Sequence, residues 1–188
     1  NKSSEGIERI NDYLLCIEKI HKLADYITIN ISSPNTPDLR DLHLKENLQN
    51  LITSVEKKID EVKFTKPVFL KISPDETDES IEMIVDLVNN SSFTGLIATN
   101  TTIEKDNLSN KKLKNEAGGV SGQPLMEKST NKILLIRSKC SDIPLIGVGG
   151  VMSKDDYILK INAGADLVQI YTGFIIKGPN LINQIIRD

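Results

Sequence analysis

The sequence predicts an α/β fold, a (β/α)8 barrel of which only about the last five strands are present. Amphipathic helical periodicity alternates with short apolar runs along the whole chain, which is typical of a parallel sheet covered by helices. Polar residues follow each run, as they do at the rim of a barrel. A doubly wound sheet is the alternative, but it would require a glycine-rich turn after the first strand.

Five apolar runs are expected as strands, and turn residues bound them. They are residues 26–31, 67–72, 95–99, 144–148 and 166–171. The segments between them carry apolar residues every three or four positions. Six helices are therefore expected: residues 8–23, 44–62, 77–88 and 129–139, one that Ser153 caps and Gly164 ends, and one that Pro179 opens.

The length of the chain indicates part of a barrel. A complete barrel contains eight strands in about 250 residues, and this chain has 188 residues. We therefore expect one partial domain, residues 1–188, without a second domain and with the remaining strands before residue 1. Residues 103–127, which are rich in Lys, Asn and Gly, are predicted to form a loop over the active-site face.

The composition excludes several classes of protein. With 39% hydrophobic and 26% charged residues the chain is typical of a globular domain. Its net charge of -3 comes from scattered charges without a basic stripe, so a nucleic-acid partner is not expected. Cys16 and Cys140 lack partners at metal-ligand spacing, and Cys16 is expected in the core. No apolar run reaches the roughly 18 residues of a membrane-spanning helix.

The polar residues at the predicted strand ends form the candidate site. They offer amides, hydroxyls and one ammonium group but few carboxylates, which favours a planar, polar and partly anionic ligand. His21 and His43 fall outside the strand ends and are expected at the surface or at helix ends. The strand-end set is Asn30, Ser33, Asn35, Lys71, Thr99, Asn100, Thr101, Thr102, Gly149, Gly150, Tyr171 and Thr172.

Three features of this set each allow a structural and a functional interpretation. Asn30 ends an apolar strand, where an unpaired amide would cost roughly 1–3 kcal/mol unless a turn or a ligand pairs it. Lys71 interrupts an apolar run and needs either an ion-pair partner or an electron-rich cofactor ring. The glycines of residues 147–150 indicate either a tight turn or a cradle of backbone amides for a phosphate.

Six segments together resemble the dihydroorotate dehydrogenases. They are residues 30–36, 71–75, 99–102, 118–122, 146–150 and 169–172, and they follow the family order through the whole chain. Ser33 stands where class 2, quinone-dependent enzymes carry their serine base and class 1 enzymes a cysteine. Asp38 departs from the glycine that is usual in the family.

The resemblance implies an oxidoreductase of de novo pyrimidine biosynthesis that oxidises dihydroorotate to orotate. It implies hydride transfer to FMN, electron transfer to quinone, and Ser33 as the catalytic base. Substrate would contact Asn30, Asn35, Asn100 and Thr101; FMN would contact Asn30, Lys71, Thr99, Gly122, Gly150, Tyr171 and Thr172.

The resemblance also implies a location and leaves two alternatives. N-terminal helices absent from this sequence would hold the enzyme peripherally on the cytoplasmic face of a bacterial inner membrane, or on a mitochondrial inner membrane. One alternative is a non-catalytic barrel fragment that needs its N-terminal part, and we expect the isolated chain to be inactive. The other is a class 1 type FMN dehydrogenase.

Overall fold

The sheet has five parallel strands whose spatial order follows the chain, as predicted. The computed structural model describes residues 6–33, 42, 44–106 and 108–187. Adjacent strands are hydrogen-bonded in parallel register, so Asn30 pairs with Lys71, and Lys71 with Ile97. The strands are β1 (Ile27–Asn30), β2 (Val68–Ile72), β3 (Gly95–Ala98), β4 (Leu145–Val148) and β5 (Leu167–Gln169).

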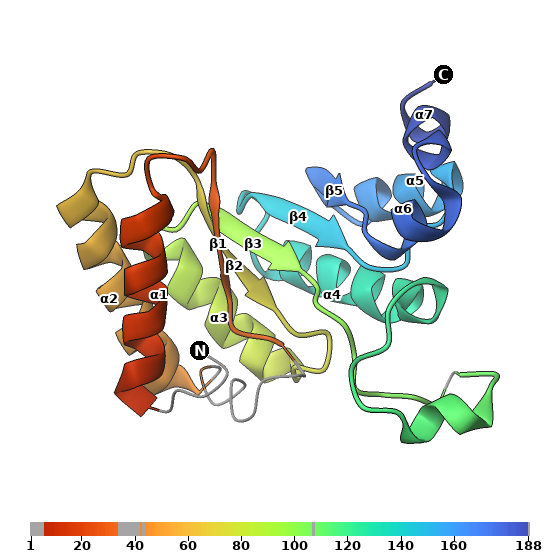
Figure 1. The fold of residues 1–188 in the computed structure, drawn as a ribbon, viewed down its shortest axis with the longest axis horizontal. Helices are drawn as coiled ribbons and strands as arrows, with labels where there is room; N and C mark the ends of the chain where they lie inside the picture. Colours follow the sequence, from red (N-terminus) through yellow and green to blue (C-terminus); the bar gives the residue numbers. More distant parts are fainter. Residues whose placement is uncertain (1–5, 34–41, 43, 107, 188) are drawn as a thin grey trace.

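Helices connect successive strands, and α1 to α4 lie along one face of the sheet (Figure 1). Ser153 caps its helix as expected, because it accepts a hydrogen bond from Asp156 N–H, and Thr77 likewise caps α3 by accepting one from Ser80 N–H. The helices are α1 (Gly6–Ile20), α2 (Lys45–Val62), α3 (Asp78–Asn89), α4 (Met126–Lys139), α5 (Lys154–Asn162), α6 (Thr172–Lys177) and α7 (Asn180–Ile186).

The two faces of the sheet are filled unequally. On the helix-covered face, alternate residues such as Ile29, Leu70 and Leu96 join the main core with the buried side chains of the helices. On the opposite face, Phe69, Ile97 and Ile146 form a small separate cluster. Lys71 follows Phe69 on this second face by the two-residue period of a strand. The sparsely filled face therefore leads to the strand ends where the candidate site was expected.

Several local expectations were wrong. Helix α6 was not predicted, and α4 begins at Met126 rather than Ser129 because the 3-10 turn η3 (Gln123–Leu125) leads directly into it. Residues 103–127 contain that turn and a second one, η2 (Lys111–Asn115), and are held to the sheet end by a bridge between Thr102 and Val120.

The first helix also differs from expectation. It ends at Ile20 rather than Leu23, and Cys16, expected in the core, is exposed. The buried stripe runs through Ile10 and Ile17 instead, and Cys16 lies one position before Ile17, about a quarter turn around the helix. None of the helices in the described ranges is long and apolar enough to cross a bilayer.

Candidate active site

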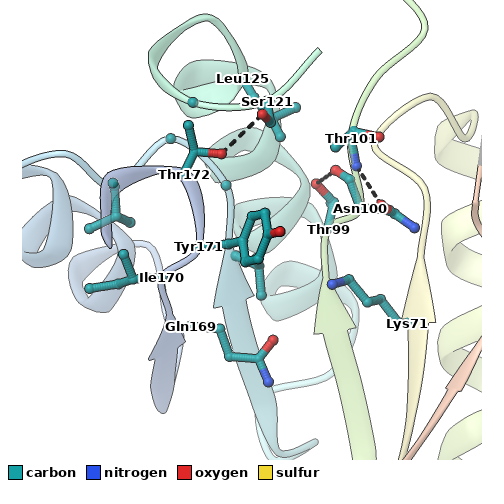
Figure 2. A pocket seen from close by; sticks show the side chains of 16 residues that line it. Lys71, Thr99, Asn100, Thr101, Ser121, Leu125, Gln169, Ile170, Tyr171 and Thr172 are labelled. Carbon is teal, nitrogen blue, oxygen red and sulfur yellow. Dashed lines mark hydrogen bonds between the residues drawn. The ribbon is translucent and has the colours of Figure 1, made fainter. Parts of the chain in front are cut away.

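A cavity of about 230 Å³ opens at the carboxyl ends of β2 to β5. Parallel strands place their carboxyl ends on one rim, which is why residues distant in sequence meet there. Nine of the residues predicted from the strand ends or the resemblance line this cavity (Figure 2). They are Lys71, Thr99, Asn100, Thr101, Gly122, Gly149, Gly150, Tyr171 and Thr172.

Lys71 is the charged side chain of the cavity. It extends from β2 into the space between β3 and Tyr171 (Figure 2). Burial lowers the pKa of the Lys71 ammonium, and no carboxylate within the described ranges forms an ion pair with it. The structural salt bridge considered for Lys71 is therefore not observed in this part of the chain. A cation kept partly out of water without a counter-ion favours an anionic or electron-rich ligand.

Asn30, Ser32 and Asn100 form a polar cluster beside the cavity. The Asn30 side-chain oxygen accepts a hydrogen bond from Asn100 Nδ2 at 3.2 Å and lies 3.0 Å from the Ser32 hydroxyl. Asn100 is fixed at its other end, where its side-chain oxygen accepts from Thr101 N–H at 2.8 Å. Ser32 is fully buried and was not predicted as a site residue. The cluster holds the two asparagine side chains in defined positions across three strands.

The turn after β4 is built from glycines that a larger residue could not replace. Gly150 has φ +82°, and a Cβ there would lie 2.4 Å from Met126 Cα. The carbonyl of Gly149 lies 3.1 Å from the Ser129 hydroxyl. Across the cavity, the Thr172 hydroxyl donates to the Ser121 hydroxyl at 3.0 Å. Helix α4 thus packs directly behind the Gly149–Gly150 turn.

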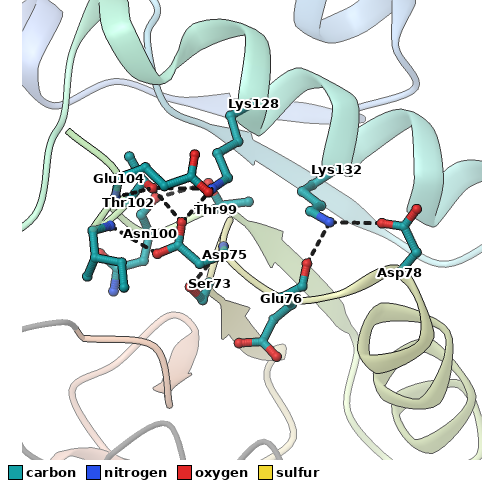
Figure 3. A network of polar contacts seen from close by, with 11 residues as sticks. Ser73, Asp75, Glu76, Asp78, Thr99, Asn100, Thr102, Glu104, Lys128 and Lys132 are labelled. Carbon is teal, nitrogen blue, oxygen red and sulfur yellow. Dashed lines mark hydrogen bonds and ion pairs between the residues drawn. The ribbon is translucent and has the colours of Figure 1, made fainter. Parts of the chain in front are cut away.

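A second polar network stiffens the rim between β2 and the 103–127 segment (Figure 3). Asp75 accepts hydrogen bonds from the Thr102 hydroxyl, from Ile103 N–H at 3.0 Å and from Lys128 Nζ at 2.7 Å. Lys128 also pairs with Glu104 at 2.5 Å. Burial raises the pKa of Asp75, but the hydrogen bonds from Lys128, Thr102 and Ile103 outweigh it and lower the pKa overall.

Not every predicted residue lines the cavity. Asn30 lies next to it and reaches it through Asn100. Ser33 follows the buried Ser32 but is not among the lining residues. Asn35, Asp38 and His43 fall outside the described residues. His21 bonds to the Glu18 carbonyl near the end of α1, as expected for a helix-end residue.

Sequence reasoning missed four residues that line or organise this rim. Ser121 and Gln169 line the cavity, whereas Ser32 and Asp75 hold its neighbours. Ser32 and Asp75 lie two and three residues beyond the ends of β1 and β2, and the strand-end rule could have found them. Ser121 lies in a long loop, and sequence gives no signal of its contact with Thr172. Together the described residues that line the cavity offer amides, hydroxyls and the Lys71 ammonium, which suit a polar aromatic ligand with a phosphate.

Comparison with known proteins gives a consistent result. The family model for dihydroorotate dehydrogenase matches residues 1–188. "Dihydroorotate dehydrogenase (quinone)" of Christiangramia forsetii is 44% identical over 186 residues, which cover 98% of this chain and 54% of that protein. The protein of the same name from Dichelobacter nodosus is 45% identical over 191 residues, which cover 100% of this chain and 57% of its own.

A solved structure shows the same fold. The dihydroorotate dehydrogenase of Eimeria tenella in complex with ferulenol superposes with a TM-score of 0.91 at 30% identity. The match covers 98% of this chain and 54% of that one. The chain thus spans about half the length of these relatives. On the full-length match to the family model and on these similarities, the chain belongs to the dihydroorotate dehydrogenase family.

Proposed function

We propose that residues 1–188 form part of a quinone-dependent dihydroorotate dehydrogenase that oxidises dihydroorotate to orotate in pyrimidine biosynthesis. The observation that carries this proposal is Lys71, an ammonium without an ion-pair partner in the described ranges, which lies in a cavity otherwise lined by amides and hydroxyls. The names of the relatives support the substrate and the quinone. The catalytic unit is the complete enzyme, by which we mean this chain together with the barrel half that the relatives add.

The lining of the cavity fits FMN as the cofactor. An isoalloxazine ring gains electron density on reduction, and the Lys71 ammonium would stabilise that density. The phosphate would bind at the amides of the Gly149–Gly150 turn and at Thr172, with Thr99, Gly122, Tyr171 and the adjoining Asn30 completing the contacts. When bound, FMN would accept a hydride from substrate and deliver electrons to quinone.

The asparagine cluster fits the pyrimidine substrate. Asn30, Asn100 and Thr101, joined by Asn35, would bind the ring carbonyls and N–H groups, because amides can donate to the former and accept from the latter. The hydrogen bond that Asn100 Nδ2 donates to the Asn30 side-chain oxygen sets their orientation before substrate arrives. We propose that Ser33 removes the proton from C5 of dihydroorotate. A serine hydroxyl is a weak base, so the proton must pass on through a threonine or water.

A serine substitution in the complete enzyme tests this function. Ser33→Ala should lower dihydroorotate oxidation near neutral pH by roughly 10²–10⁴-fold, the usual contribution of a positioned base, while flavin stays bound. Ser138→Ala, on the outer surface of α4, is the matched control and should leave turnover unchanged. If Ser33→Ala retains full turnover, Ser33 is not the base.

The partial barrel also has a testable consequence for the isolated chain. Strands β1 and β5 form the two sheet edges, and within the described residues each pairs with a single neighbour. We propose that the other barrel half covers these edges, so that residues 1–188 alone neither retain FMN nor reduce quinone analogues. A yellow, active monomer of residues 1–188 would contradict this.

We further propose that the complete enzyme acts at a membrane surface. Quinones dissolve in the bilayer, so an enzyme that reduces them must reach its interface. Binding would be peripheral, on the cytoplasmic face of a bacterial inner membrane or, alternatively, on a mitochondrial inner membrane. Co-sedimentation of the complete enzyme with lipid vesicles tests this, and full recovery in the supernatant at low salt would contradict it.

A further inference from the structure

A buried lysine lies behind the candidate phosphate turn, and the proposed chemistry does not use it. Lys160 of α5 has an exposed fraction of 0%. Its aliphatic stem passes Gly147 of β4, where an added Cβ would lie 3.6 Å from Lys160 Cδ. A lysine in such a position is uncommon, because the ammonium loses its hydration.

The Lys160 ammonium binds the first turn of α4. It donates to the Ser129 hydroxyl at 2.5 Å, to the Thr130 hydroxyl at 2.8 Å and to the Met126 carbonyl at 3.3 Å. All three partners are neutral, so hydrogen bonds compensate the burial, but no carboxylate in the described ranges forms an ion pair with the ammonium.

Two of these partners contact the glycine turn directly. The Ser129 hydroxyl lies 3.1 Å from the Gly149 carbonyl. The backbone of Met126 packs so closely on Gly150 that no side chain would fit between them. The Lys160 ammonium is therefore connected to Gly149 through Ser129 and to Gly150 through Met126. This arrangement fixes the turn and also places a positive charge behind it.

The charge of Lys160 is poorly balanced by the protein itself. Burial lowers its pKa to about 7, against which the negative charge of Asp156 on the same helix acts in the opposite direction. That carboxylate is engaged elsewhere, since it accepts from Met152 N–H and from the Ser153 hydroxyl. From α4 the groups that face the ammonium are hydroxyls and a carbonyl, and from β4 it is Gly147. An anion bound at the turn would supply the missing negative charge.

We propose that Lys160 is a positioning residue that holds the Gly149–Gly150 turn and supplies a buried positive charge for a phosphate monoester bound there. This inference rests on the proposed function, because FMN is the ligand that would bring the phosphate. Phosphate binding should keep Lys160 protonated, so that the ligand binds more weakly as the free protein loses this proton above pH 7. Lys160 touches neither ligand nor reacting atoms in this account.

The test compares FMN with riboflavin, which carries the same ring without the phosphate. Affinities of the complete apoenzyme are measured by quenching of flavin fluorescence between pH 7 and 9, where the phosphate is already a dianion. FMN affinity should fall with pH, by at most about tenfold per unit. Riboflavin lacks the phosphate, so its affinity should fall less steeply with pH than that of FMN.

Two variants separate charge from packing. Lys160→Gln retains a hydrogen-bond donor without charge and should weaken FMN by about tenfold at pH 7, a loss of 1.4 kcal/mol, with less than about twofold effect on riboflavin. Lys160→Met, which keeps only the aliphatic stem, should weaken FMN and riboflavin binding to the same extents as Lys160→Gln. In both, the additional pH dependence of FMN should disappear.

The outcomes are distinguishable. Parallel pH profiles for FMN and riboflavin in the unsubstituted enzyme would overturn the role of Lys160, and this measurement needs no variant. Equal weakening of both ligands by Lys160→Gln would show a structural role only and would also overturn it. If the enzyme binds neither flavin, the proposed function itself fails.

Discussion

The substitution Gly150→Ala should destabilise the protein far more than the same change at Gly178. Both glycines have a positive φ that L side chains rarely adopt, with φ +82° at Gly150 and φ +66° at Gly178. Alanine in such a sparsely populated conformation costs about 1–3 kcal/mol. A Cβ at Gly178 would meet none of the described residues within 4 Å, so the backbone cost is the whole effect there. Gly178→Ala is therefore a control for alanine at a positive-φ glycine without a steric clash.

At Gly150 the new methyl group also collides with α4. Its Cβ would lie 2.4 Å from Met126 Cα and 2.6 Å from Met126 N, and backbone atoms cannot move aside as a flexible side chain could. Overpacking of this kind adds about 1–3 kcal/mol. We expect Gly150→Ala to lose about 2–6 kcal/mol in total, against about 1–3 kcal/mol for Gly178→Ala.

Urea unfolding followed by circular dichroism measures this difference. With a slope of about 1–3 kcal/mol per molar urea, an extra loss of about 2 kcal/mol moves the midpoint by roughly 1 M relative to the control. Gly150→Ala should also weaken FMN binding, because α4 must shift away from the turn. Equal midpoints for the two variants would refute the close packing of Met126 on Gly150.

Three further predictions concern ionisable groups. Lys71→Met should raise the free energy of unfolding of the ligand-free protein by about 1 kcal/mol, because it removes a desolvated cation. The same variant should bind FMN more weakly. A lower urea midpoint for the variant would contradict this. Asp75→Asn should cost about 1–3 kcal/mol at pH 7. Because the pKa of Asp75 is lowered, its contribution to the free energy of unfolding is present above about pH 4 and is lost as the pH falls through its folded pKa. The free energy of unfolding of the variant should therefore fall less as the pH is lowered below about 4. Burial lowers the pKa of Lys160 from 10.5 to about 7, so the unfolded chain binds its proton more tightly than the folded protein does. The free energy of unfolding should therefore rise between pH 7 and 10, by at most about 1.4 kcal/mol per pH unit. The same pH profile for Lys160→Met would contradict this.

The strands and their order could be predicted from sequence because buried parallel strands leave a strong signal. Apolar runs such as residues 67–72 are bounded by turn residues, and each helix between them shows its own period. The helix α6 gave no such signal. It has six residues, and Ile175 and Ile176 are exposed, so its apolar residues do not mark a buried face. Cys16 shows the same limit, because periodicity alone did not fix which side of α1 is buried.

The strand-end residues of the candidate site could be predicted for a topological reason. Parallel strands place Lys71, Asn100 and Tyr171 at one rim, independently of the conformation of the loops. Lys160 and Ser129 lie within helices, where a lysine or serine is normally a surface residue, so nothing in the sequence marks them as buried. Their role depends on how α4 and α5 pack against β4, which only the three-dimensional structure shows.

The central claim is that one rim of parallel strand ends binds both a flavin and a pyrimidine. A crystal structure of the complete enzyme with FMN and orotate tests it most directly. We predict the flavin ring in contact with Lys71, its phosphate at Gly150 and Thr172, and orotate hydrogen-bonded to Asn30 and Asn100. A flavin bound away from Lys71 and the Gly149–Gly150 turn would contradict the account.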